Sequence, residues 1–307
     1  MVTFRYYVVS LVAVFLALAM GVVVGSTLID RAIVDRLDRS VDSVSDRLDR
    51  QRDENARLRD EIQRLQDYAD GTAPAVVDGA LDGGAVAVVA ERGVDADVVE
   101  ATVATLQQAD GAVPGILWLE PGWALAEDGD RARLADALHV PDNGPGRLRD
   151  RAWGRLVTAL EGGSVQGDPL QELSDGGFIS YQDVGGESGV TDLAGVGEQV
   201  VLVSGPDSQL SPDLTLAMGR GLVRAGVPAV LAEAWQESDD GPARGTVAGL
   251  VRAQDDLADS VSTVDDLDLV QGRVAATLAL ADLRTGVQGH YGYGDDADSA
   301  LPERPPA

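Results

Sequence analysis

Tyr6–Ile29 reads YYVVSLVAVFLALAMGVVVGSTLI, a run of 24 residues without a single charge. A helix rises about 1.5 Å per residue, so a helix of this length crosses the roughly 30 Å hydrocarbon core of a bilayer. After this run, charged residues resume at Asp30 and recur to the end of the chain, which makes the remainder too polar to enter lipid. We therefore expect residues 1–29 to form a single-pass transmembrane anchor.

A secretory signal peptide is the alternative interpretation of this segment. Arg5 precedes the apolar run, and Ala17-Leu18-Ala19 resembles a small-residue cleavage site. Cleavage there would leave the mature chain with an exposed apolar start at Met20, so the length of the run favours an anchor that is not cleaved. The positive-inside count, which sets Arg5 against four arginines in residues 31–47, favours a cytoplasmic location for the chain after residue 29, although long domains translocate regardless.

Residues 30–69 carry a heptad pattern that predicts a coiled coil. Counted from Val34, nine of eleven a and d positions are apolar over five heptads. Asn55 at a central a position, together with Val at a and Leu at d, favours a parallel homodimer. The positions expected to carry the contact are Leu37, Val44, Leu48, Asn55, Leu58, Ile62 and Leu65. The alternative is one long solvated helix that folds back on its own domain.

Small residues line one face of the anchor. Ala17, Gly21 and Gly25 are spaced four residues apart, and the Gly-x-x-x-Gly step permits close approach of two helices in a membrane. The motif is weak alone, but it agrees in phase with a parallel coiled coil. We expect Gly21 and Gly25 to assist the dimer.

The rest of the chain predicts an α/β domain at residues 85–286, after a linker at 70–84 and before a flexible Gly/Asp/Pro-rich tail at 287–307. Short unalternated apolar runs at 85–90, 116–119, 200–203 and 229–232 are separated by segments of helical period. This pattern is typical of a mainly parallel sheet covered by helices on both faces. Helices are expected over 94–110, from Ser211 to Gly226, and over 267–283.

Composition excludes several kinds of chemistry. The chain has no Cys, and all 24 basic residues are Arg, so thiolate metal sites, a Walker loop and a Schiff-base lysine are absent. Residues 71–307 hold 14 Arg against 39 acids. Such a surface repels phosphate backbones, which makes nucleic-acid binding improbable.

The expected carboxyl ends of the strands carry no catalytic motif. They read Glu91-Arg92-Gly93, Glu120-Pro121-Gly122, Ser204-Gly205-Pro206 and Glu233-Ala234-Trp235. No Gly-x-Gly-x-x-Gly opens a helix after a strand, and neither a Gly-x-Ser-x-Gly elbow nor a His-Glu-x-x-His motif occurs. The domain is therefore expected to be non-catalytic, with no resident cofactor.

His290 is the candidate metal ligand. It lies in Gly289-His290-Tyr291-Gly292, just before Asp295, Asp296 and Asp298, and a His near carboxylates can bind a divalent cation. The alternative is an exposed Gly-rich tail, because one imidazole among flexible acids seldom makes a selective site. Upstream, residues 261–264 are expected to form a short strand, and Asp265-Asp266 to cap the helix that begins near Leu267.

Three segments resemble the mycobacterial copper transport protein B (MctB) family of Actinobacteria: residues 9–21, residues 261–266 and residues 289–292. The resemblance runs nearly end to end and brings no established active-site motif. It implies an envelope protein linked to copper efflux and homeostasis, described as an outer-membrane channel, whose members have also been associated with division-related envelope assembly through partners. It further implies a cytoplasmic N-terminus and a domain outside the cytoplasm.

Two functions from different classes are compatible with these residues. One is a transport or copper-homeostasis protein. The other is a dimeric scaffold or regulator that recruits an envelope partner and binds no copper. Copper(I) prefers soft ligands, and the chain offers no Cys and only Met1, Met20 and Met218. One helix also cannot enclose a pore by itself, so the ligand-poor sequence favours the scaffold.

Overall fold

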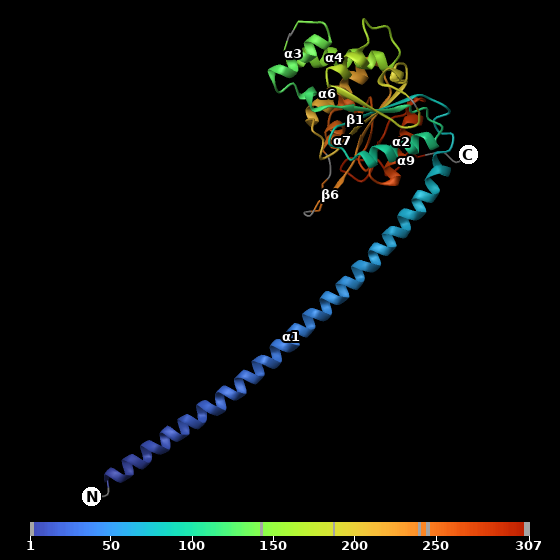
Figure 1. The fold of residues 1–307 in the computed structure, drawn as a ribbon. Coiled ribbons are helices and arrows are strands. Elements are labelled where there is room, and N and C mark those ends of the chain that lie inside the picture. Colours follow the sequence, from blue (N-terminus) through green and yellow to red (C-terminus); the bar gives the residue numbers. More distant parts are fainter. Residues whose placement is uncertain (1–2, 142–143, 187, 239–240, 244–245, 304–307) are drawn as a thin grey trace. The chain divides into compact units, whose positions relative to one another are not determined.

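The computed structural model describes residues 3–303 apart from 142–143, 187, 239–240 and 244–245. Side chains are described over the same range except at residues 3, 25–43, 236–238 and 241–243. The chain divides into an N-terminal helical unit up to Gln66 and a globular unit from Asp67 onward. Figure 1 shows the long helix α1 and the α/β unit after it.

Helix α1 spans Thr3–Val77 without a break, which corrects the expected linker at 70–84. The helix continues past Gly71 and Pro74 because its last turns pack into the globular unit: Ala73 and Val77 are buried in the core beneath α2 and α9. The connecting turn covers only residues 78–83, where Gly79 and Gly83 adopt positive φ. At the other end, Phe4–Val24 is long and apolar enough to cross a membrane, with a mean hydropathy of 2.7.

Within the described residues, seven strands form one sheet. They are β1 (Val86–Glu91), β2 (Gly115–Leu119), β3 (Ile179–Asp183), β4 (Gln199–Ser204), β5 (Ala229–Glu233), β8 (Ser262–Val264) and β9 (His290–Tyr291), in the order β3-β2-β1-β4-β5-β8-β9. Every neighbouring pair is parallel except β2 with β3. At the centre, Val88 of β1 pairs with Ile116 on one side and Val201 on the other. The predicted mainly parallel sheet is confirmed.

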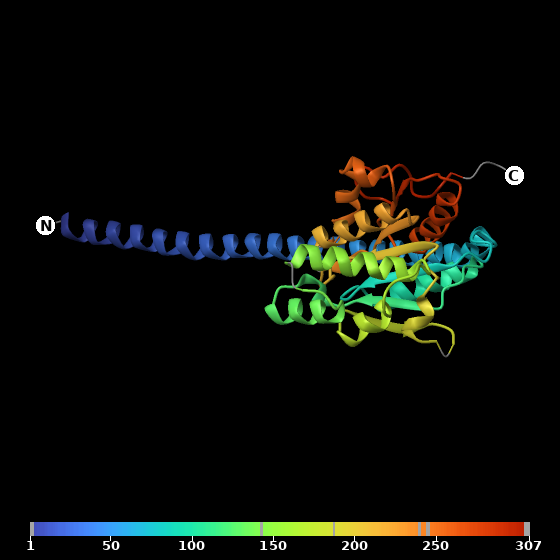
Figure 2. The ribbon, with the colours of Figure 1, turned by 90° about the horizontal axis from the view of Figure 1, so that it is seen from above.

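Helices cover both faces of this sheet, as Figures 1 and 2 show. Helices α2 (Ala96–Gln108) and α9 (Val270–Leu283) bury one face together with the end of α1. The other face is covered by a second core built from α3 (Asp128–Ala137), α4 (Pro145–Leu160), α5 (Pro169–Asp175), α6 (Pro212–Ala225), α7 (Val247–Arg252) and α8 (Asp255–Ala258). A separate hairpin, β6 (Gln236–Ser238) with β7 (Gly241–Ala243), comes after β5.

Local signals placed the helices well. α6 begins after Ser211 with Pro212 in its first turn, and Gly226 ends it in the left-handed conformation at φ 79°. α2 begins after Asp95, whose carboxylate accepts the backbone N–H of Asp97 at 2.9 Å. The last helix is an exception, since α9 starts at Val270 and not near Leu267.

The segment expected as a flexible tail contributes the last strand of the sheet. His290 and Tyr291 pair with Thr263 and Val264 of β8, and Tyr291 is buried. The β8 edge would otherwise leave its backbone groups without sheet partners, and β9 satisfies them. The domain boundary expected at residue 286 is therefore too early.

Candidate functional site

The carboxyl ends of the parallel strands are the natural place for a site in this fold. The chain leaves β1 for β2 on one side, while β4 lies on the other side of β1, so the strand order switches direction between β1 and β4. Ligands of open α/β sheets bind at such a switch point. The structure places Glu91, Ser204 and Glu233 at the ends of β1, β4 and β5, as the sequence predicted.

Glu91 is held by three hydroxyl groups. It is fully buried, and its carboxylate accepts hydrogen bonds from Ser204 Oγ at 2.8 Å and from the hydroxyls of Ser208 and Thr215. Burial raises the pKa of Glu91 above its ordinary value, while the three hydroxyl donors work in the opposite direction. With both oxygens hydrogen-bonded, the side chain joins β1 to β4 and α6.

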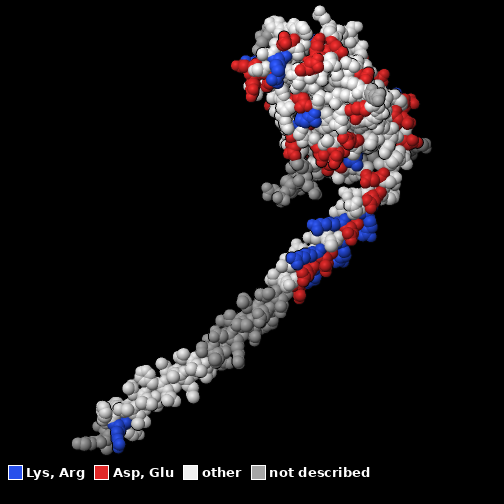
Figure 3. All heavy atoms as spheres, in the orientation of Figure 1, with Lys and Arg blue, Asp and Glu red and all other residues white. Residues whose placement is uncertain are grey.

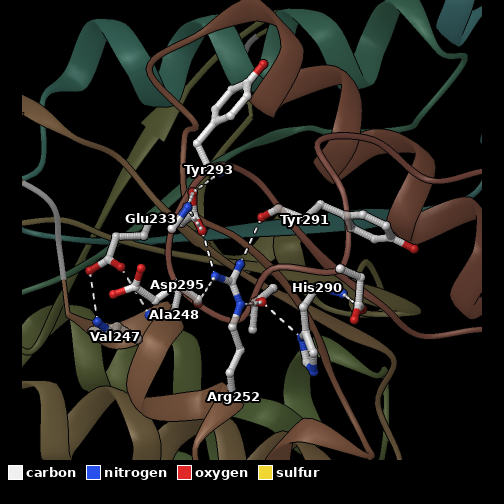
Figure 4. A network of polar contacts seen from close by, with 12 residues as sticks. Glu233, Val247, Ala248, Arg252, His290, Tyr291, Tyr293 and Asp295 are labelled. Atoms are coloured by element: carbon white, nitrogen blue, oxygen red, sulfur yellow. Dashed lines mark hydrogen bonds and ion pairs between the residues drawn. The ribbon is translucent and has the colours of Figure 1, made fainter.

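Glu233, at the end of β5, is likewise hydrogen-bonded within the domain. Its two carboxylate oxygens accept the backbone N–H groups of Val247 at 3.0 Å and Ala248 at 3.1 Å, at the start of α7 (Figure 4). Burial raises the pKa of Glu233, and the charges of Asp265 and Glu91 add to the rise. The place where an anionic ligand would meet free N–H groups is thus taken by the protein's own carboxylate.

Two small cavities flank the loop after β4. One, of about 280 Å³, is lined by residues that include Asp95, Asp207 and Trp235, and the other, of about 250 Å³, includes Glu233. Both fall below the roughly 300–1,000 Å³ of typical ligand pockets. Gly93, at φ 105°, lets the β1 loop close onto this edge, since a Cβ there would collide with the carbonyl oxygen of Asp207. Small size and acidic walls argue against phosphate ligands.

A third polar cluster lies beside β2. Arg92 stacks 4.6 Å above the Trp118 ring and donates to Glu120 Oε1 at 2.8 Å and to Ser180 Oγ. Burial alone would raise the pKa of Glu120, but the hydrogen bonds from Arg92 and Ser180 and the charge of Arg92 hold that pKa below its ordinary value. The cluster joins β1, β2 and β3.

The C-terminal edge of the sheet carries a denser network, drawn in Figure 4. Arg252, the last residue of α7, donates to Asp265 at 2.7 Å, to Thr263 Oγ1 at 2.9 Å and to the carbonyl oxygens of Tyr291 at 2.9 Å and Asp295 at 3.1 Å. No motif in the sequence singled out Arg252. In the sequence, Arg252 is distinguished only by its positive charge among many acidic residues.

His290 lies in this network without a set of metal ligands. Its Nδ1 is 3.0 Å from Thr263 Oγ1, and burial, with the charge of Arg252, lowers its pKa. Asp298 uses one carboxylate oxygen to accept the backbone N–H of His290 at 2.9 Å. Within the described part of the chain, no group of three or more His, Cys, Asp or Glu side chains is placed to hold a metal ion.

The expected helix cap at Asp265-Asp266 is wrong. Asp265 pairs with Arg252 and accepts the backbone N–H groups of Tyr293 at 2.8 Å and Gly294 at 3.0 Å. α9 starts after Leu269 without a side-chain cap, because the chain makes a further turn at residues 266–269. Asp266 is fully buried with neither carboxylate oxygen hydrogen-bonded, and burial together with Asp265 and Asp268 raises its pKa to about 7.

The heptad positions lie on one continuous helix. Val44, Leu48, Leu58, Ile62 and Leu65 are each about half exposed in the single chain, at 48–63 %. Gly21 has open space around it, since an added Cβ would meet nothing within 4 Å. The side chains at Leu37 and Gly25 lie outside the described residues. The coiled coil and the dimer remain predictions.

Charged side chains are distributed differently in the globular unit and in the N-terminal helix. Figure 3 shows acidic side chains spread over the visible face of the globular unit with few arginines, and both kinds of charge interleaved along the described part of the helix. This agrees with the 14 Arg and 39 acids of residues 71–307.

A family model described as "Copper transport outer membrane protein, MctB" matches residues 1–302. The chain belongs to the MctB family. Relatives named copper transporter MctB occur in Mycobacterium tuberculosis H37Rv and Mycobacterium bovis, each 30 % identical over 97 % of this chain and 98 % of the relative. A third, from Mycobacterium leprae, is 27 % identical over the same shares. The resemblance read from three sequence segments is thereby confirmed, and the MctB match includes both the apolar helix and the α/β domain.

Proposed function

We propose that this MctB-family chain serves copper homeostasis as a dimeric, single-pass membrane scaffold that presents its α/β domain to a partner in the cell envelope. One observation carries the proposal. A helix with an apolar span at Phe4–Val24 continues without interruption into a heptad segment whose apolar side chains stand about half exposed in one chain.

A second copy of the chain is the occupant that suits this heptad face. Complete burial of a Leu, Ile or Val side chain contributes about 1.5–3 kcal/mol, and half of that remains to be gained at each exposed position. Among the residues whose side chains are described, each helix has five such positions. Asn55 at an a position can pair only with its own counterpart in a parallel, in-register dimer, which sets strand number and orientation. Gly21 lies in the same helix and permits close approach within the membrane.

The copper role rests on the family, and direct copper ligation by this chain is not part of the proposal. Copper(I) favours thiolate and thioether ligands, and the chain has no Cys and only three Met. His290 Nδ1 lies 3.0 Å from Thr263 Oγ1, and burial with the charge of Arg252 lowers the pKa of the imidazole in spite of the charges of Asp298 and Asp259. A scaffold would act on copper transport through the proteins that it holds.

We also propose that the α/β domain is not an enzyme. The carboxylates at its strand ends are hydrogen-bonded within the domain: Glu91 to three hydroxyls, Glu233 to two backbone N–H groups and Glu120 to Arg92. General acid–base work needs a group within hydrogen-bond reach of a substrate, and these side chains face their own neighbours. In the proposed orientation, the N-terminus is cytoplasmic and the domain lies outside the cytoplasm.

Copper tolerance of cells tests this proposal. A strain that lacks the gene is complemented with the natural chain, Leu48→Asp, Ala56→Asp or His290→Ala. Leu48→Asp places like charges in the seam, whereas Ala56→Asp adds the same charge at an outward b position. We expect the natural chain, Ala56→Asp and His290→Ala to restore growth in copper, and Leu48→Asp to fail.

Membrane amounts of each variant are measured alongside growth. Full rescue by Leu48→Asp at normal amounts would contradict the dimeric scaffold. Failure of His290→Ala at normal amounts would instead restore direct copper handling as the function.

A further inference from the structure

An apolar recess of the domain lies away from the switch-point cavities, between α4, α6 and the short helix η1 (Pro121–Ala124). Its volume is about 540 Å³, within the range of ligand pockets. Trp123, Trp153, Leu214 and Met218 line it and are buried, while Asp150 and Asp213, which also line it, are exposed. The recess therefore has an apolar floor and an acidic rim.

The floor is held in place by specific contacts. The Trp123 and Trp153 rings meet edge to face, with centroids 6.1 Å apart and an interplanar angle of 83°. Trp153 Nε1 donates to the carbonyl oxygen of Met218 at 2.9 Å, which locks α4 to α6. Gly221 makes room for this ring, since a Cβ there would collide with it. The shape of the recess is thus preformed, which lowers the entropic cost of binding.

One donor in this floor lacks a partner. Trp123 Nε1 is buried without a hydrogen bond, whereas Trp118 Nε1 donates to Gln182 at 3.0 Å and Trp153 Nε1 to Met218. An unsatisfied buried donor costs about 1–3 kcal/mol. The side chain of Trp123 is fully buried, so this cost falls on the folded domain itself.

The rim selects for positive charge. Among the described lining residues, Asp150 and Asp213 contribute two carboxylates against the one guanidinium of Arg149, which donates to the carbonyl oxygen of Ala124 at 2.9 Å. Arg224 approaches Asp150 only to 4.0 Å, with both side chains more than 60 % exposed, so this pair is weak. The acidic domain around the recess draws cations toward it.

We propose that this recess binds small amphipathic amines. The apolar body would lie on the floor formed by Trp123, Trp153 and Met218, and the protonated amine would lie at the rim between Asp150 and Asp213. A scaffold needs no such ligand, so this site is independent of the proposed function. It gives the α/β domain a means of responding to a soluble cationic molecule.

Three probes that share one body test the charge preference: 4-methoxyphenethylamine, 2-(4-methoxyphenyl)ethanol and 4-methoxyphenylacetate. Binding to the full-length protein in nanodiscs is measured by calorimetry. We expect the amine to bind about fivefold to tenfold more tightly than the alcohol, and the acid more weakly than both.

Three variants locate the site. Ala217→Phe fills the recess from a partly exposed position on α6 and should abolish specific binding, which also corrects for partition of the probes into lipid. Asp150→Asn with Asp213→Asn should remove the preference for the amine over the alcohol. The exposed Asp136→Asn is the matched control and should leave that preference intact.

The proposal is overturned if no probe binds at millimolar concentration, if the acid binds as well as the amine, or if Ala217→Phe leaves binding unchanged.

Discussion

Arg252 and Asp265 form an ion pair of 2.7 Å that is almost completely buried, with side chains 2 % and 5 % exposed. The same guanidinium donates to Thr263 of β8 and to the carbonyl oxygens of Tyr291 and Asp295. One side chain therefore joins the end of α7 to two strands and the adjoining loop. These contacts add to the backbone pairing of β8 with β9 that holds the segment around His290 in the sheet.

Loss of Arg252 should be strongly destabilising. Arg252→Gln leaves Asp265 as an uncompensated buried charge, which typically costs about 3–5 kcal/mol of unfolding free energy. Arg220→Gln is the matched control, because Arg220 pairs with Asp256 at 2.9 Å on the exposed surface, where a pair contributes about 0–1 kcal/mol. Urea unfolding monitored by circular dichroism measures both variants. Equal losses would contradict the role given to the buried pair.

Asp266 should make the stability of the domain depend on pH. Its carboxyl titrates near pH 7 in the folded state and near its ordinary value of 3.8 when unfolded. Between these values Asp266 is protonated in the folded state and ionised in the unfolded state. Its contribution to the unfolding free energy therefore falls as pH rises from about 4 to 7 and does not change further above pH 7.

Asp266→Asn removes this dependence. The quantity to compare is the unfolding free energy of the variant minus that of the natural chain. This quantity should be up to about 4 kcal/mol larger at pH 8 than at pH 4, and any pH-independent effect of the amide cancels from the comparison. Asp136→Asn controls for the loss of one acid from the surface. A gain of the same size at both pH values would show that Asp266 is ionised in the folded state at neutral pH.

Much of the fold could be predicted from the sequence because its signals are local. Unalternated apolar runs marked β1, β2, β4 and β5, and Pro212 with Gly226 marked α6. The errors lie where contacts between residues far apart in the sequence determine the structure. α1 continues past Pro74 because Ala73 and Val77 find a core to pack against, and β9 forms because β8 offers it backbone partners.

The polar sites were harder to predict for the same reason. Because His290 is close in sequence to Asp295, Asp296 and Asp298, the sequence suggested a metal site shared by these residues. In the structure, Asp298 instead accepts the backbone N–H of His290 and so helps to hold β9. Asp265, expected as a helix cap, instead meets an arginine that no motif distinguished. Neither Glu91 nor Glu233 could be recognised as internally satisfied from the strand ends alone, because their donors come from other elements.

Copper binding to the full-length protein should be weak. In calorimetry with copper(I) and copper(II), we expect no tight stoichiometric site, and His290→Ala should change little, because Nδ1 of His290 lies against Thr263 Oγ1 and no group of three metal ligands forms around it among the described residues. His139→Ala, at an exposed position on another part of the domain, is the control. Tight one-to-one binding that disappears only in His290→Ala would show that this histidine ligates copper.

The globular domain should be accessible from outside the cytoplasm. Protease added to intact spheroplasts should degrade residues after about 30, while a cytoplasmic marker stays intact, because the anchor at Phe4–Val24 separates them. Complete protection of the domain would reverse the orientation. A mature N-terminus at Met20 would show instead that the apolar helix is a cleaved signal.

Disulfide cross-linking in native membranes tests the parallel dimer most directly. The chain has no cysteine, so Val44→Cys introduces a single thiol at a d position, and Asp46→Cys places one at the outward f position of the same turn. On mild oxidation, Val44→Cys should yield a covalent dimer and Asp46→Cys should not, and adding Leu48→Asp to Val44→Cys should remove the dimer. Absence of a cross-link in Val44→Cys, or equal cross-linking at both positions, would contradict the dimeric scaffold.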